Sequence, residues 1–230
     1  MNRFKITNAF MAAIAIAVVF TSCKKNDAEP TTGRIQLQVE TTPSSTVEVG
    51  SGRIAAANDL VFTSGEITIR EVVFGGDNET TPIDLTIEQI STIDYATGEV
   101  TPPVTIEVQP GTYRSVYLGI EMQDDGDLPS TVLNGNYTTT DGEDVPVRFE
   151  FNSGEVFEAE AAIVEIPAGA NIVGKITFDA VAWFANVSAE RMDNATRAED
   201  GTIVISETSN AAIFDIVADG LDVATEAVFE

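Results

Sequence analysis

Apolar and polar residues alternate repeatedly from Ile35 onward, which is the pattern of a β-strand with one buried face. In one such segment Val116, Leu118, Ile120 and Met122 share a face, while Ser115, Tyr117 and Glu121 share the other. Turn-forming runs rich in Gly, Asn and Asp separate these segments at intervals of roughly 10 to 15 residues. This spacing is typical of an antiparallel, all-β sandwich, which is the fold class that we expect.

Several expectations about individual strands follow from the same pattern. Strands are expected near residues 34–40, 58–62, 66–74, 104–108, 157–161 and 172–184. The apolar residues change parity across Arg70 and Glu71, which predicts a β-bulge. Residues 113–122, 131–139 and 145–152 are expected to be strands, and a meander of these three is one arrangement to consider.

The last third of the chain changes in character. A short helix is expected from Ser188 to Thr196, capped by Ser188, and a strand from Ile203 to Ser206. A second helix is expected from Asn210 to Asp219, ending at Gly220. We therefore expect residues 34–230 to form a single β-sandwich domain, with 185–230 as a mixed helical extension that covers one end of the sandwich.

The N-terminus has the pattern of a secretory signal. Arg3 and Lys5 precede an apolar run from Phe10 to Phe20, which is too short to span a bilayer. The following Thr21-Ser22-Cys23 resembles the lipobox of bacterial lipoproteins, in the form common among Bacteroidota. The resemblance implies that a signal peptide, residues 1–22, is removed and that Cys23 carries the lipid. Residues 23–33 would then be a polar tether, and the protein would be held at the outer membrane, facing the periplasm or the cell surface.

A second resemblance concerns the segment Gln109-Pro110-Gly111-Thr112-Tyr113. With the strand that follows, it is similar to the Pro-Gly-x-Tyr strand of a bacterial lipoprotein domain of unknown function. Residues 68–72 and the pair Phe178-Asp179 match further strands of that family. The resemblance implies a β-sandwich of transthyretin-like or carboxypeptidase-regulatory-like type. It implies no catalytic residues.

Composition excludes several classes of function. Loss of residues 1–22 removes two of the 12 Lys and Arg and none of the 37 Asp and Glu, so the net charge goes from −25 to −27. Such a chain repels nucleic acid phosphates, and no nucleic acid partner is expected. The chain has no His, and its one Cys is Cys23, which removes most catalytic triads and zinc sites. We expect no enzymatic activity and no cofactor.

Two acidic turns are the candidates for a metal site, because calcium prefers several oxygen ligands on a loop. Neither turn fits the calcium-binding loop of an EF-hand, and solvated acidic turns are the simpler interpretation. In a meander the two turns would lie at opposite ends of a strand and could not form one site. The candidate ligands are Asp124, Asp125, Asp127, Asp141, Glu143 and Asp144.

Trp183 is the candidate for a ligand contact. In a strand it and Phe184 would face opposite ways, and Trp183 would either stack on a sugar or pack beneath the C-terminal helices. The leading hypothesis is therefore a non-catalytic binding or structural module for glycan, protein or matrix, anchored through Cys23. One alternative is a glycan hydrolase that uses two carboxylates. The other is a calcium-dependent adhesion module.

Overall fold

The computed structural model describes residues 32–42, 60–78, 82–124, 126, 128–152, 154, 156–221 and 225–229. The predictions for the signal peptide, Cys23, most of the tether, Asp125 and Asp127 lie outside these residues. The described chain is mainly β, as predicted. Its strands are β1 (Gly33–Thr41), β2 (Leu60–Asp77), β3 (Pro82–Asp94), β4 (Val100–Thr101), β5 (Thr105–Val108), β6 (Gly111–Met122), β7 (Thr131–Thr138), β8 (Asp144–Phe151), β9 (Val156–Ile166), β10 (Asn171–Phe178), β11 (Ile203–Ile205) and β12 (Thr225–Phe229). Its helices are α1 (Ala180–Trp183), α2 (Ala189–Asp193) and α3 (Ala211–Ala218).

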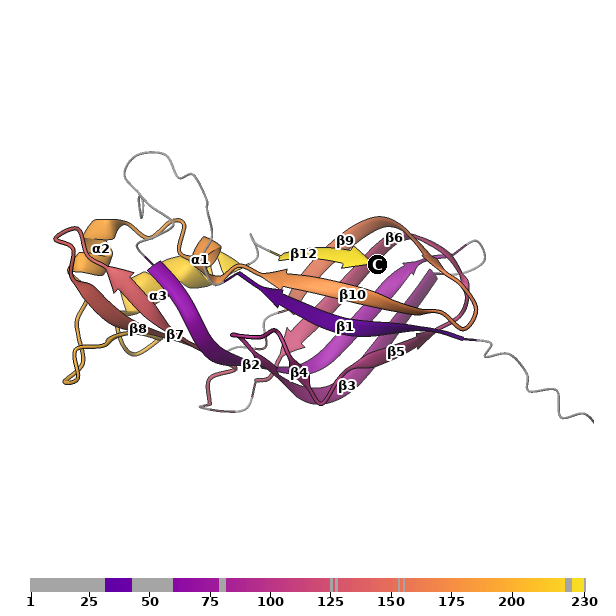
Figure 1. The fold of residues 1–230 in the computed structure, drawn as a ribbon, viewed down its shortest axis with the longest axis horizontal. Coiled ribbons are helices and arrows are strands. Elements are labelled where there is room, and N and C mark those ends of the chain that lie inside the picture. The colour runs from indigo at the N-terminus through magenta and orange to yellow at the C-terminus, as the bar shows by residue number, and fades with distance from the viewer. Residues whose placement is uncertain are drawn as a thin grey trace, which may run out of the picture.

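The strands form two sheets. The four-stranded sheet has the order β12-β10-β1-β5, and the eight-stranded sheet runs β11-β8-β7-β2-β3-β4, with β6 paired to β2 and β9 to β6. Most neighbours are antiparallel, but β1 pairs with β10, and β8 with β11, in parallel. Figure 1 shows the four-stranded sheet lying across β2, β3, β6 and β9, while β7, β8 and the helices occupy the other end.

The 18-residue strand β2 joins the two ends of the molecule. Its first half pairs with β7 and its second half with β6, while β3 lies along its other edge. The prediction of two separate strands in this region is therefore wrong. The three segments considered as a meander do not form one, because β6 and β7 both pair with β2. Of that arrangement, the β7–β8 hairpin is present. The β-bulge is confirmed, with a register shift between Ile69 and Glu71.

The predicted inner faces form the core. Val116, Leu118, Ile120 and Met122 of β6 are all buried, and they face the buried Ile35 and Leu37 of the four-stranded sheet. Phe157 of β9 meets Phe178 of β10 across the two sheets, with ring centroids 5.2 Å apart. Burial of these apolar side chains is what holds the two sheets together.

The strand predicted over residues 172–184 ends early. β10 stops at Phe178, and Asp179 then caps α1 by accepting a hydrogen bond from the Ala182 amide at 3.1 Å. Trp183 and Phe184 are consequently not on opposite faces of a strand. Both are buried, with 2% and 1% of their surfaces exposed.

The C-terminal helices are confirmed. The Ser188 hydroxyl caps α2, and α3 packs Phe214 against Phe149 and Phe151 of β8. The segment does more than cover an end, because β11 extends the eight-stranded sheet and β12 the four-stranded one. No helix in the described ranges is both long and apolar enough to cross a membrane.

Candidate functional site

The predicted metal ligands do not come together in the described part of the chain, which holds no group of three or more acidic side chains suited to a metal ion. Asp124 follows β6, whereas Asp141, Glu143 and Asp144 lie at the other end of β7. Asp144 accepts a hydrogen bond from the Thr138 hydroxyl at 2.8 Å. Asp141 lies in the β7–β8 turn, and Asp144 is the first residue of β8.

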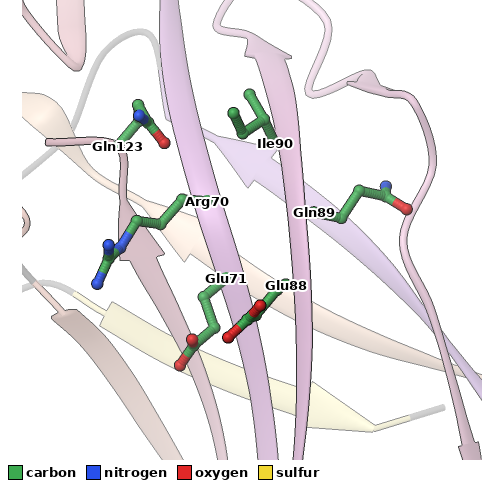
Figure 2. Close-up of a pocket in the computed structure, with 6 residues that line it drawn as sticks. All are labelled: Arg70, Glu71, Glu88, Gln89, Ile90 and Gln123. Atoms are coloured by element: carbon green, nitrogen blue, oxygen red, sulfur yellow. The ribbon is translucent and has the colours of Figure 1, made fainter. Parts of the chain in front are cut away.

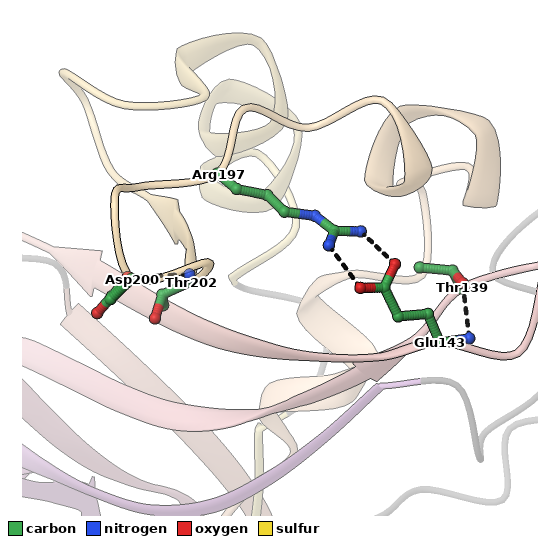
Figure 3. Close-up of polar contacts among 5 residues, drawn as sticks. All are labelled: Thr139, Glu143, Arg197, Asp200 and Thr202. Atoms are coloured by element: carbon green, nitrogen blue, oxygen red, sulfur yellow. Dashed lines mark hydrogen bonds and ion pairs between the residues drawn. The ribbon is translucent and has the colours of Figure 1, made fainter.

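Glu143 is held by an arginine. Arg197 donates two hydrogen bonds, of 2.8 and 2.9 Å, to the two carboxylate oxygens of Glu143, as Figure 3 shows. These bonds lower the pKa of the Glu143 carboxyl. The pairing ties the β7–β8 turn to the segment that leads into β11, and it leaves this carboxylate poorly placed to bind a cation.

Asp193 ties the same turn to the end of α2. Its carboxylate accepts hydrogen bonds from the hydroxyls of Thr140, at 2.6 Å, and Tyr137, at 2.9 Å. The Thr140 bond is the main cause of a lowered pKa at Asp193. The contacts of Asp193 and Arg197 therefore act in folding, since both join the hairpin to the C-terminal segment.

Trp183 is a core residue, so the hypothesis of an exposed stacking platform at this position is wrong. Its ring contacts Phe149 at one end of the molecule and Phe157 and Phe178 at the other, with centroids 6.2 to 6.3 Å apart. A sugar could not reach this ring without opening the core. Trp183 instead connects the two ends of the aromatic core.

An aromatic side chain does occur on the outer face of the eight-stranded sheet, by which we mean the solvent side of β3, β2, β6 and β9. Neighbouring strands place their outward residues in rows across this face. The first row is Asp84, Gly75, Tyr117 and Glu160, the second is Thr86, Val73, Gly119 and Glu158, and the third is Glu88, Glu71, Glu121 and Val156.

Tyr117 lies flat on this face because its neighbour on β2 is glycine. A Cβ on Gly75 would overlap the ring and the hydroxyl of Tyr117, so the ring occupies the place of the missing side chain. Burial against the sheet raises the pKa of the Tyr117 phenol, and the charge of Asp84 and a hydrogen bond with it raise it further. One side of the ring covers Gly75, and the ring stays partly exposed.

A shallow hollow opens at the other end of the outer face. It has a volume of about 370 Å³ and lies around the bulge in β2. Figure 2 shows Glu71 and Glu88 side by side, Ile90 and Gln123 above them, and Arg70 turned away toward β6. Arg70 donates a 2.5 Å hydrogen bond to Glu121, and this bond is the main cause of the raised pKa of the guanidinium.

Carboxylates dominate the charge of the outer face. Its only cation in the three rows and the hollow is Arg70, which is already paired with Glu121. The remaining acids on it are Glu71, Asp84, Glu88, Glu158 and Glu160. Arg114 of β6, exposed and opposite Asp77 of β2, lies just beyond the first row. Within the three rows and the hollow carboxylates outnumber cations, so this part of the face favours an uncharged or positively charged ligand over an anion.

The sequence alone indicated that Tyr117 points away from the core but not what surrounds it. Gly75, Asp84 and Glu160 become its neighbours only through the pairing of β6 with β2 and β9 and of β2 with β3. The one available signal was a pair of glycines, Gly75 and Gly119, at outward positions of strands. Glycine weakens a strand and often marks a place where another group approaches closely.

The chain was also compared with known proteins. No family model, no curated protein and no solved structure matches it.

Proposed function

We propose that this protein is a non-catalytic glycan-binding module, anchored at the outer membrane through a lipid on Cys23. The outer face of the eight-stranded sheet is the proposed binding surface, and Tyr117 is its stacking platform. The observation that carries the proposal is the placement of the Tyr117 ring flat over Gly75, with carboxylates on both sides.

The chemistry of a sugar matches this arrangement. A pyranose ring presents C–H groups on its faces and hydroxyls around its edge. An aromatic ring offers a broad apolar surface to the C–H groups, and carboxylates accept hydrogen bonds from the hydroxyls. Tyr117 supplies the apolar surface. Asp84 and Glu160, which stand on either side of it in the same row, supply the hydrogen-bond acceptors.

Tyr117 differs from the other large aromatic residues of the described chain. Tyr95, Tyr113 and Tyr137 are buried, as is Trp183. The hydroxyl of Tyr113 donates to the Gln109 carbonyl at 2.7 Å, and that of Tyr95 to the Thr42 carbonyl at 3.1 Å. Tyr117 is thus the tyrosine that is available to a ligand.

Attachment of the protein to the outer membrane is part of the same proposal, and the N-terminal sequence supports it. The basic start, the apolar run and Thr21-Ser22-Cys23 form a lipoprotein signal, and a diacyl anchor holds a protein stably on a bilayer. A module held in this way would keep a polysaccharide, or another envelope component, close to the cell.

Affinity electrophoresis with soluble neutral polysaccharides tests the proposal. Wild type should be retarded by at least one of glucan, mannan, xylan or levan, and Tyr117→Ala should lose that retardation. Tyr117→Phe should keep most of it, since the ring remains. Thr105→Ala, on β5 of the opposite sheet, is the control and should behave as wild type. Retardation that Tyr117→Ala leaves intact, or release of reducing sugar ends by the purified protein, would contradict the proposal.

A further inference from the structure

The hollow around the β2 bulge lies on the same outer face as Tyr117. It is lined by Arg70, Glu71, Glu88, Gln89, Ile90 and Gln123. Ile90 is 62% exposed, and it shares this exposure with Val156 and Ile163 of β9. An exposed apolar group beside carboxylates repeats the combination found at Tyr117, and Gln123 adds an amide here.

The bulge accounts for the shape of the hollow. The register shift between Ile69 and Glu71 turns Arg70 outward, where Glu121 binds its guanidinium. Glu71 and Glu88 stand directly opposite each other on β2 and β3, a pairing of like charges that destabilises a sheet. A ligand that donates hydrogen bonds to both carboxylates would relieve this repulsion.

Gln89 helps to build the hollow rather than to bind in it. Its side-chain amide donates to the Ser91 hydroxyl at 3.0 Å and to the Pro103 carbonyl at 3.2 Å. Figure 2 shows it pointing away from the other five residues. The groups free to meet a ligand are therefore the carboxylates of Glu71 and Glu88, the Gln123 amide and the Ile90 side chain.

The distance between the two features sets the size of the ligand. At a rise of about 3.3 Å per residue, the strand from Gly75 to Glu71 covers roughly 13 Å. The residues between them on β2, β3 and β6 are small or apolar on this face: Val73, Thr86 and Gly119. Glu158 of β9 ends the same row, and its side chain reaches toward Gly119. A chain that runs along β2 would pass over Val73 and Thr86 with Glu158 at its border, and this path is longer than one sugar ring.

We infer that the hollow is a second subsite of the outer face, and that the ligand is a linear, uncharged oligosaccharide lying along β2 from Tyr117 to Glu71 and Glu88. This inference rests on the proposed glycan-binding function and adds the length, direction and charge of the ligand. The excess of carboxylates over cations in the three rows and the hollow disfavours uronate-containing and sulfated chains by repulsion.

Calorimetric titration with chains of different length tests the second subsite. The probes are neutral gluco-, manno- and xylo-oligosaccharides of one, three and six units. For the sugar that binds, affinity should rise at least about tenfold from one unit to six, because the longer chain reaches the hollow. The double variant Glu88→Ala, Ile90→Ala should lose most of this gain, whereas Tyr117→Ala should weaken binding at every length. Thr105→Ala should match wild type.

The outcomes separate the two proposals. Affinity that depends on Tyr117 but not on chain length overturns the second subsite and leaves the proposed function standing. Binding that does not depend on Tyr117, or no binding by any of the series, overturns both. Polygalacturonate or dextran sulfate bound as tightly as the neutral hexamers would overturn the charge selection. Thermal melting of the double variant checks its fold, and removal of Glu88 from its place opposite Glu71 should not lower the melting temperature.

Discussion

Tyr117 and Gly75 are paired across the β6–β2 ladder, and the phenol ring occupies the space that a side chain on residue 75 would need. The two residues therefore act as a unit. The glycine makes the flat position of the ring possible, and the ring in turn covers a backbone that glycine leaves bare, a known way to support glycine in a sheet.

Gly75→Ala should consequently affect both binding and stability. The added methyl displaces the ring, so we expect glycan affinity to fall about as far as in Tyr117→Ala, together with a lower melting temperature. Gly111→Ala is the matched control, because a Cβ there meets nothing closer than 3.8 Å. Titration calorimetry and thermal melting measure the two effects. Wild-type affinity in Gly75→Ala would mean that the position of the ring is unimportant.

The Glu143–Arg197 pair should contribute to stability in a salt-dependent way. Both side chains are partly exposed, so salt screens their attraction. We expect Glu143→Gln and Arg197→Gln each to lower the melting temperature, and the double variant to lose less than the sum of the two. The coupling from this double-mutant cycle should shrink between 0.05 and 1 M NaCl. Additive effects at low salt would show that the pair is not coupled.

Asp193 should stabilise the fold near neutral pH and lose this effect in acid. Hydrogen bonds, first from Thr140, lower its pKa in the folded state. A carboxyl whose pKa is lower in the folded state stabilises the folded protein fully at pH values above its pKa in the unfolded state, about 3.9. This stabilisation is lost as the pH falls through the pKa of the folded state. Asp193→Asn should therefore melt below wild type at pH 7, with the difference narrowing toward pH 2. A constant difference across this range would contradict the assignment.

Asp179 should behave in the opposite sense. Burial raises its pKa in the folded state, so the charged form is a cost to folding. The cost is absent at pH values below the pKa of Asp179 in the unfolded state, and it is complete at pH values above the pKa in the folded state. Asp179→Asn keeps an oxygen that can accept from the Ala182 amide, so it should melt above wild type at pH 7 and close to it at pH 3. Circular dichroism melts at both pH values decide this, and a less stable variant at pH 7 would contradict it.

Cys23→Ser tests the proposed anchor. Without the thiol no lipid can be attached, so the protein should move from the membrane fraction to the soluble fraction of cells that express it. Fractionation with immunoblotting measures the change, and metabolic labelling with a fatty acid should mark wild type alone. A variant that stays in the membrane fraction would contradict lipid anchoring.

Local pattern predicted much of the fold. The inward faces of β1, β6 and β8 follow from period-two alternation, because a strand with one solvated face must sort its side chains in this way. The bulge at Arg70 and the cap at Ser188 also depend on neighbouring residues alone. The end of β10 was missed because Ala180 to Phe184 is apolar throughout, so the sequence carries no change of period where α1 begins.

Pairing between distant strands was the part that the sequence could not supply. β6 and β7 follow each other in the chain with a turn between them, which favours a hairpin, yet both pair with the long strand β2. The candidate site depends on that pairing. Tyr117 was recognised as outward, but its place over Gly75 and between Asp84 and Glu160 exists only in the assembled sheet.

Tyrosine-selective NMR gives the most direct test of glycan binding at Tyr117. The chain has four tyrosines, and Tyr95, Tyr113 and Tyr137 are buried while Tyr117 is partly exposed. With ring-labelled tyrosine, four signals are expected, and Tyr117→Phe assigns the one that disappears. Titration with the neutral hexasaccharide that binds in calorimetry should shift the Tyr117 signal to saturation, with the same affinity, and leave the other three in place. An unmoved Tyr117 signal at a saturating concentration of that glycan would contradict the account.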